Sequence, residues 1–439
     1  MKKILLITTC LLFAAITLSA EGSVDFSGII ETSWGAAAPW TDSDNSAGRY
    51  TLGNTNFTGK LDAFYNNSSA YAEASFSYDA INSESGNLSN GLNLSLGELW
   101  IDYTDSFWGI RIGRQKAAWG KADGIDITNI LCPSDNSSLS AMTGDDSKLA
   151  IDAIRFSLSG NQFTADAYWI PFFTPSALPL EENNTLRKFI VPSSYELVIP
   201  EYGIRSTLPV SINQFEKPDS ALWNGEYGIK LSGYFSALDL SLYGFYGWDD
   251  MPILDYSINF TTPDAPSNKM IVNGHYKRVA MIGADAALPI GETVLRLESA
   301  FFPQRHFQKA EGGSLQKNQF SSLAGIDWMP SGWTITAQYY CDLILDDIDL
   351  LERTNKYEHG ASLSISKSLV NETLELSASG IIGLNDFDSM ISPSISYSLS
   401  DQISLGAEAF IFIPGPEKDG KYGSYKDLSS LCVKAKFSF

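Results

Sequence analysis

Runs of about ten residues in which apolar side chains alternate with small or polar ones recur along the chain, and this pattern most constrains its fold. The clearest run places Ile391, Ile395 and Tyr397 between serines, and a second run of the same kind follows at residues 403–413. Successive side chains of a β-strand point to opposite faces, so each run predicts a strand with one apolar face and one polar face. Such strands, separated by turn residues, are typical of a transmembrane β-barrel.

A soluble β-sandwich is the main competing interpretation, because its strands alternate in the same way. Three features favour the membrane barrel. The non-apolar faces carry Ser, Thr, Gly and Tyr instead of the Lys and Glu of a solvated sheet, and short turns alternate strictly with long loops. The last run ends on Phe439, and a terminal aromatic residue resembles the signal by which bacterial outer-membrane barrels are recognised for insertion. The barrel-assembly machinery and the lipid bilayer of the outer membrane are therefore expected partners.

Counting the runs predicts the size of the barrel. We expect an all-β fold made of a single transmembrane antiparallel β-barrel of about 18 strands, with short periplasmic turns and long extracellular loops. About 16 strands is the alternative, if one weak early pair is miscounted. The two longest loops are expected at residues 120–149 and at the proline-rich residues 172–223, where strand ladders cannot run. The expected strand centres lie near residues 28, 59, 74, 98, 112, 155, 166, 230, 243, 282, 298, 324, 338, 363, 378, 395, 408 and 434.

Residues 1–20 predict a secretory signal peptide, with Lys2 and Lys3 ahead of an apolar stretch and small residues ahead of Glu21. A membrane anchor helix and lipid attachment at Cys10 are the alternatives. No later segment is apolar enough for a membrane helix, which leaves residues 21–439 for the barrel. An exported barrel of this kind is expected in the outer membrane of a bacterial cell.

The charge balance and the scarcity of His and Cys exclude several functions. With 30 Lys and Arg against 51 Asp and Glu, the formal net charge is −21, which excludes a nucleic-acid partner because phosphates need basic side chains. The 3 His and 4 Cys follow no metal-binding or catalytic spacing. We therefore expect no cofactor, no metal site and no enzymatic activity.

Charged side chains on two adjacent strands are the strongest candidates for the lining of the pore. Arg111 lies between two isoleucines that face outward, so it faces the lumen, whereas strict alternation would turn Arg114 toward lipid. A β-bulge at Gly113 would return Arg114 to the lumen. A similar break in the apolar pattern near Glu98 predicts a second bulge, which turns Glu98 and Asp102 inward. Further lumen candidates are Arg155, Arg296 and Glu298.

The third extracellular loop, at residues 120–149, is the expected constriction. In general porins, which a barrel of this size resembles, the third loop folds inward and narrows the channel. Carboxylates in this loop that face arginines on the wall would create a transverse electric field across the lumen. They would give the channel a weak preference for cations. Solvated aspartates without such a role are the alternative. The candidates are Asp123, Asp126, Asp135, Asp145 and Asp146.

Residues 108–135 carry a series of short motifs, which are Gly113-Arg114-Gln115, Trp119-Gly120, and Asn129 and Pro133 ahead of Asp135. Their order resembles a family of porin-like bacterial outer-membrane proteins of unassigned function, over residues 95–175. Cys132 departs from the pattern of that family. The resemblance implies an outer-membrane role in transport and supplies no substrate.

The leading prediction for function is a porin-like channel for the passive passage of small hydrophilic solutes, narrowed by the third extracellular loop. Two alternatives stay open. The first is a carrier for hydrophobic or lipid-like substrates, and the second is a non-conducting adhesin or structural barrel. A homotrimer is expected by analogy with porins of this size.

Overall fold

The computed structural model describes residues 22–38, 47–81, 91–138, 147–181, 184, 186–199, 203–259, 268–417 and 420–439. In this part of the chain, 18 strands form one antiparallel sheet that closes on itself, and four more strands form a separate small sheet. The predicted signal peptide at residues 1–20 lies outside the described residues. No helix among the described residues is long and apolar enough to cross a membrane.

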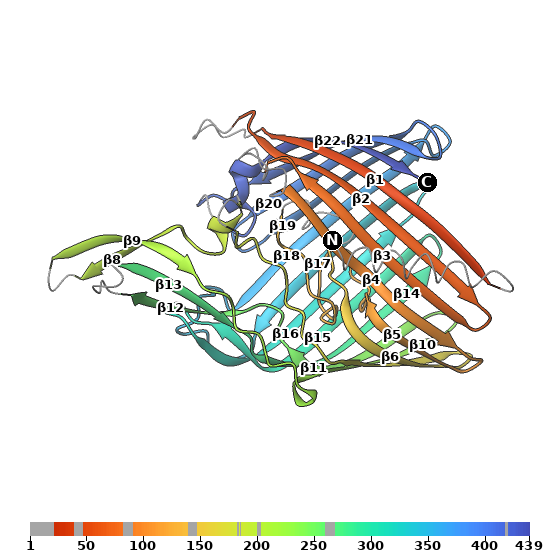
Figure 1. The fold of residues 1–439 in the computed structure, drawn as a ribbon, viewed down its shortest axis with the longest axis horizontal. Coiled ribbons are helices and arrows are strands. Elements are labelled where there is room, and N and C mark those ends of the chain that lie inside the picture. The colour runs from red at the N-terminus through yellow and green to blue at the C-terminus, as the bar shows by residue number, and fades with distance from the viewer. Residues whose placement is uncertain are drawn as a thin grey trace, which may run out of the picture.

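Each barrel strand pairs with its neighbours in chain order, and the first strand pairs with the last, so the ring has no free edge. Figure 1 shows the short turns and the C-terminus at one end of the barrel and the long loops at the other. The barrel strands are β1 (Ser23–Ala37), β2 (Tyr50–Tyr65), β3 (Ser68–Asp79), β4 (Leu92–Thr104), β5 (Trp108–Gln115), β6 (Ile151–Ser159), β7 (Phe163–Ile170), β10 (Glu226–Tyr234), β11 (Asp239–Trp248), β14 (Arg278–Ile290), β15 (Thr293–Gln308), β16 (Ser314–Trp328), β17 (Trp333–Ile344), β18 (Tyr357–Leu369), β19 (Leu374–Gly383), β20 (Asp388–Ser398), β21 (Ile403–Ile413) and β22 (Ser430–Ser438). Short 3-10 helices lie in the loops, namely η2 (Arg187–Phe189), η4 (Leu222–Asn224) and η5 (Gly423–Leu428).

The alternation of side chains gives the barrel two different faces. On β11, Leu240, Leu242 and Tyr246 are exposed on the outer face, whereas Ser241 and Tyr243 are buried on the inner face. Residues that pair across neighbouring strands share a face, so the same alternation continues round the ring. The predicted all-β barrel of 18 strands is confirmed, and each expected strand centre lies within an observed strand.

Two connections at the loop end are shorter than the predicted alternation of short turns and long loops requires. Residues 309–313 join β15 to β16, and residues 384–387 join β19 to β20. Gly312, Gly313 and Phe387 have positive φ angles, which let the chain reverse tightly. The predicted strict alternation of short and long connections is therefore wrong at these two places.

The proline-rich connection between β7 and β10 also differs from the prediction, because part of it forms strands. β8 (Ser194–Ile199) pairs with β9 (Ile204–Ile212), and β9 pairs in parallel with β13 (Lys269–His275), which in turn pairs with β12 (Ile253–Asn259). Pro209 is tolerated in β9 because it lies where the partner changes from β8 to β13. This small sheet projects beyond the barrel at the loop end (Figure 1).

The seam of the barrel joins β1 to β22 and involves the last residue of the chain. Gly28 N donates to Phe439 O at 2.8 Å, and Phe439 N donates to Gly28 O at 3.0 Å. The Phe439 ring occupies the space of a Cβ on Gly28, and it contacts Phe26 and Phe57 at ring-centroid distances of 6.0 and 6.4 Å. A side chain at position 28 would therefore displace the terminal ring.

Gly28→Ala should weaken this seam, because the new methyl group must push the Phe439 ring out of its contacts. We expect a loss of about 1 kcal/mol in the free energy of unfolding, measured by urea unfolding in lipid vesicles. Gly59→Ala is the matched control, since Gly59 pairs directly with Gly28 and its Cβ would meet atoms no closer than 3.5 Å. Equal stability of the two variants would contradict this account of the seam.

Candidate functional site

Part of the connection between β5 and β6 lies inside the barrel and crosses it; we call residues 116–128 the crossing segment. At its start, Lys116 N donates to Glu98 Oε1 at 2.7 Å. Further along, Asp123 N donates to Gln338 Oε1 at 2.9 Å, and Gln338 Nε2 donates to Asp123 O at 2.7 Å. Because β5 is the fifth strand of the ring of 18 and β17 is the thirteenth, these contacts join nearly opposite walls.

Glu298 on the inner face of β15 holds the middle of the crossing segment. The residue is only 3% exposed. Lys121 N and Ala122 N donate to Glu298 Oε2 at 2.7 and 2.9 Å, and Thr128 donates from both N and Oγ1 to Oε1, each at 2.7 Å. These donors compensate a charge whose burial would otherwise be costly. The neighbouring Arg296 donates from Nη1 to Lys121 O at 2.8 Å.

Gly120 allows the crossing segment to approach the wall closely. Its φ angle is +87°, and a Cβ there would overlap the Glu298 carboxylate. Gly120 N donates to Tyr243 Oη at 3.0 Å, and Tyr243 Oη donates in turn to Asp285. The glycine of the Trp119-Gly120 motif is therefore required by the contact between segment and wall.

A hydrophobic cluster fills the space between this connection and one side of the inner wall. Trp119, Ile127 and Leu131 are buried in it, and the Trp119 and Tyr243 rings lie 5.0 Å apart. We did not predict this cluster, because the inner face was expected to be polar throughout. The signal in the sequence is that β11, β14 and β15 carry apolar residues on both faces. The wall contributes Ile151, Tyr168, Tyr243, Phe245, Val279, Met281, Phe302 and Leu323.

Three of the predicted lumen residues form one charged group on the inner wall of β4 to β6. Asp102 Oδ2 accepts from Arg111 Nε at 2.9 Å and from Arg155 Nη2 at 3.3 Å. The Arg111 guanidinium also lies 3.7 Å from the centre of the Trp100 ring, a cation–π contact. Asp102 is 8% exposed, so its charge is compensated locally by the two arginines.

The bulge predicted near Glu98 is present. β3 and β4 shift register between Ala72 and Ala74, where Gly97 and Glu98 stand opposite a single residue. Glu98 then accepts the hydrogen bond from the start of the crossing segment.

The bulge predicted at Gly113 is absent, and Arg114 does not join the inner group. β5 keeps its register with both neighbours through Gly113, although this residue has a φ of 130°. Arg114 pairs with Leu99, which is exposed on the outer face, and forms an ion pair with Asp152 at 3.3 Å. The prediction that Arg114 faces the lumen is wrong, because no extra residue is inserted to change the alternation.

The aspartates predicted for the constriction loop mostly have partners within that loop. Asp126 forms an ion pair with Lys148 at 2.5 Å, and Asp135 Oδ1 accepts from Ser137 N at 3.0 Å. Asp123 is exposed at the contact with β17. Two further candidates, Asp145 and Asp146, lie outside the described residues. Among the residues that the structure describes, no group of three or more His, Cys, Asp or Glu could hold a metal ion.

Three loops meet at Ser176, at the loop end of the barrel. Ser134 N donates to Ser176 Oγ at 3.1 Å, and Ser176 Oγ donates to Asp250 Oδ2 at 2.6 Å. Burial raises the pKa of the Asp250 carboxyl above its ordinary value, and the neighbouring carboxylate of Asp249 adds to the rise. Asp249 itself forms an ion pair with Arg305 at 2.7 Å.

The connection between β21 and β22 also packs against the inner wall, near the loop end. Gly423 N donates to Asp388 Oδ2 at 3.0 Å. The Tyr425 ring of η5 lies 4.4 Å from the Phe189 ring of η2, so this connection contacts the long proline-rich one. A second, smaller hydrophobic cluster around Phe412 supports η5.

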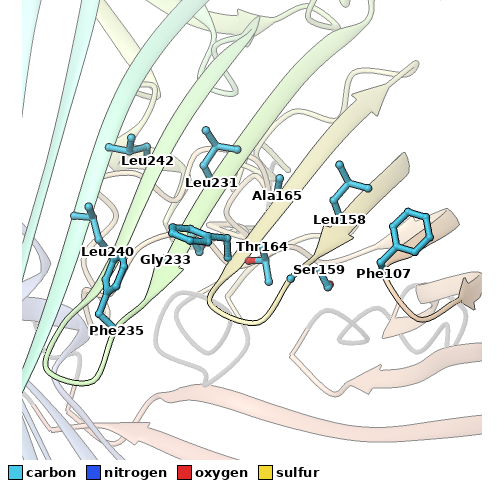
Figure 2. Close-up of a pocket in the computed structure, with 13 residues that line it drawn as sticks. Phe107, Leu158, Ser159, Thr164, Ala165, Leu231, Gly233, Phe235, Leu240 and Leu242 are labelled. Atoms are coloured by element: carbon cyan, nitrogen blue, oxygen red, sulfur yellow. The ribbon is translucent and has the colours of Figure 1, made fainter.

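An apolar hollow of about 660 Å³ lies on the outer face of the barrel, near the short turns. Figure 2 shows Phe107 at one side of it and Phe235 at the other, with Leu231 between them. Leu231 and Leu242 are exposed on the outer face. The hollow therefore opens away from the lumen and is separate from the crossing segment.

A closed ring of 18 antiparallel strands, with an apolar outer face and a segment fastened across its interior, has the fold of outer-membrane channel barrels. The chain belongs to the family described as "Protein of unknown function (DUF1302)", which matches residues 3–427. This match extends far beyond residues 95–175, where short motifs first indicated a family of unassigned function. No curated protein matches the chain in sequence.

Solved bacterial structures are similar to this chain at low sequence identity. OccK2 (OpdF) of Pseudomonas aeruginosa, in complex with glucuronate, has a TM-score of 0.52 at 9% identity, covering 95% of this chain and 98% of that chain. OccAB1 of Acinetobacter baumannii has a TM-score of 0.52 at 8% identity, covering 95% and 96%. The outer membrane channel DcaP of the same organism has a TM-score of 0.44 at 8% identity, covering 96% and 98%. At these identities the first two likenesses show a shared fold alone.

Glu298→Ala should release the crossing segment, because the donors of Lys121, Ala122 and Thr128 lose their acceptor. Leaving buried donors unpaired costs about 1–3 kcal/mol. Amide hydrogen exchange of residues 120–128 should therefore become roughly tenfold faster or more. Glu375→Ala is the control, since Glu375 is exposed on β19. Unchanged exchange in Glu298→Ala would show that the apolar cluster alone holds the segment.

Asp250→Asn should stabilise the protein near neutral pH. The raised pKa means that the folded protein holds the Asp250 proton more tightly than the unfolded chain, so stability falls as the pH rises from the unfolded pKa of about 4 to the raised folded pKa. Asparagine keeps an acceptor for Ser176 and removes the charge. The difference in urea midpoint between variant and wild type should shrink as the pH falls toward about 4.

Asp249→Asn is the matched control for this experiment, because it breaks the ion pair with Arg305 and should lower the midpoint. If Asp250→Asn were also less stable than wild type near neutral pH, the account of the buried carboxylate would be wrong.

Proposed function

We propose that the chain is a porin-like channel in the outer membrane of a bacterial cell, through which small hydrophilic solutes pass passively. A barrel of this strand number encloses a water-filled lumen rather than a packed core. The observation that carries the proposal is the crossing segment, which is fastened to β15 by Glu298 and to β17 by Gln338. In that position, part of the third extracellular loop narrows the lumen.

The outer face supports a place in a lipid bilayer. Leu94, Ile101, Leu242 and Ile282 are among its large apolar side chains, each at least half exposed. Such a surface is stable when lipid covers it. The expected signal peptide at residues 1–20, insertion by the barrel-assembly machinery through the strand that ends at Phe439, and a homotrimer are parts of the same proposal.

Charged residues of the inner wall support a modest ion selectivity. The group of Arg111, Asp102 and Arg155 would line the passage, and both arginines pair with the one carboxylate, which leaves one net positive charge. Arg296 and Glu298 act instead by holding the crossing segment. With opposite charges paired and carboxylates in excess, we infer a weak preference for cations.

A carrier for hydrophobic substrates would need apolar side chains along an open path. The apolar residues of the inner wall, such as Tyr243, Met281 and Phe302, are buried against the connection between β5 and β6. This burial favours the porin-like function over the carrier.

The adhesin alternative has one observation in its favour, the sheet of β8, β9, β13 and β12 that projects beyond the barrel. A surface-binding role for this sheet would be separate from passage through the lumen. Shortening the β8–β9 hairpin should leave conductance unchanged in a channel, whereas it should remove surface binding in an adhesin.

Single-channel conductance of the refolded protein in a planar bilayer tests the proposed function. We expect stable steps, and Glu298→Ala combined with Gln338→Ala should enlarge them, because a released segment blocks less of the lumen. Glu375→Ala is the control and should keep the wild-type step, because Glu375 lies at the start of β19, near the short turns and outside the anchors of the segment. Silence of a folded wild-type barrel, or smaller steps in the double variant, would overturn the proposal.

A further inference from the structure

The inner wall of the barrel is covered on one side and uncovered on the other. From β6 to β16, inner residues such as Tyr243, Met281 and Phe302 are buried beneath the connection between β5 and β6. From β18 through the seam to β4, inner residues such as Ser379 and Ser95 are exposed, except near the loop end, where the connection between β21 and β22 packs over the inner residues Phe410 and Phe412 of β21. A solute inside the barrel therefore meets the second side.

Serines face one another across three neighbouring strands of the uncovered side. Two rows cross β18, β19 and β20 in register, Ser364–Ser379–Ser392 and Ser366–Ser377–Ser394, and we call these six residues the serine wall. The Ser377 and Ser394 hydroxyl oxygens are 2.6 Å apart. Ser392 is 8% exposed and donates to Glu408 Oε1 at 3.1 Å. The other five serines are at least partly exposed, so their small hydroxyl groups form a polar surface.

The other flank of the seam repeats this arrangement with hydroxyl and amide groups. Two rows cross β2, β3 and β4 in register, Asn56–Ser77–Asn93 and Thr58–Ser75–Ser95. Thr58 Oγ1 and Ser75 Oγ lie 2.9 Å apart. The uncovered side therefore presents donors and acceptors on both flanks.

Most charges on the uncovered side are paired or stand opposite a charge of the other sign. The ion pairs are Lys434–Glu408 at 2.6 Å and Lys60–Glu73 at 3.5 Å, and Lys436 is opposite Glu31 in register. The carboxylates of Asp25, Asp62 and Glu375 lie near the short turns, outside the hydroxyl rows. Along these rows, an ion finds few free opposite charges.

We propose, on the basis of the channel function above, that the solute path is off-centre and runs along the serine wall and its counterpart on β2 to β4. The path favours small neutral polyhydroxylated solutes over ions of the same size. Hydroxyl and amide groups both donate and accept hydrogen bonds, so they can replace the hydration of a solute rich in hydroxyls. Removing water from an ion remains unfavourable along this path, because few opposite charges replace the lost hydration.

Thiol modification during single-channel recording tests the position of the path. Ser379→Cys, modified by a negatively charged methanethiosulfonate, should lower the conductance. Ser241→Cys is the matched control, since Ser241 is an inner-face serine on the covered side and is 4% exposed. Both variants carry Cys341→Ala; Cys132 and Cys432 stay, because each is 1% exposed.

If mass spectrometry shows that Ser379→Cys is modified while the conductance stays unchanged, the proposed path is overturned. An equal loss of conductance in Ser241→Cys would overturn it too. In both cases the wild-type channel would still conduct, so the proposed function would stand. A folded wild-type barrel that never conducts would instead refute the proposed function itself.

Permeation into proteoliposomes tests the substrate class. Mannitol should enter roughly fivefold faster than gluconate or glucosamine, which are of similar size and carry opposite charges. The double variant Ser379→Arg and Ser394→Arg should reduce this advantage over gluconate, because it supplies the missing positive charge. Equal or faster entry of either charged solute in the wild type would contradict the proposal.

Discussion

The hydrogen bonds that Glu298 accepts are the interaction on which the interior of this barrel depends. A carboxylate buried on β15 is stable only because backbone and hydroxyl groups of the crossing segment satisfy it. The crossing segment depends on Glu298 in turn. It pairs with no strand at these positions, so its contacts with the inner wall determine its path. Gly120 lets the segment approach the wall closely, and Gln338 holds its far end at β17.

The closed ring allows such an interior to be polar on one side and packed on the other. Hydrogen bonds between neighbouring strands, completed where β1 meets β22, hold the barrel together without a central core. Inner residues therefore need not pack into a central core. On one side they anchor a loop through apolar contacts, and on the other they present hydroxyl and amide groups to the lumen.

The barrel could be predicted from the sequence, and the third loop was expected to fold inward, but the course and the anchors of the crossing segment could not be predicted. Alternation as in residues 391–399 identifies strands directly, because the period of two is imposed by the two faces of the sheet. The course of a loop depends instead on partners distant in sequence, such as Lys121 and Glu298. Gly113 shows a further limit: it permits a bulge that would turn Arg114 inward, but nothing local decides whether the bulge forms.

Pulsed electron paramagnetic resonance on spin-labelled protein in lipid vesicles tests the central claim most directly. One label replaces Asp123, and the other is placed on the outer face either at Tyr339 of β17 or at Ile112 of β5. A segment fastened to the far wall predicts a narrow distribution and a shorter distance from Asp123 to Tyr339 than to Ile112. A broad distribution, or a shorter distance to Ile112, would contradict the account.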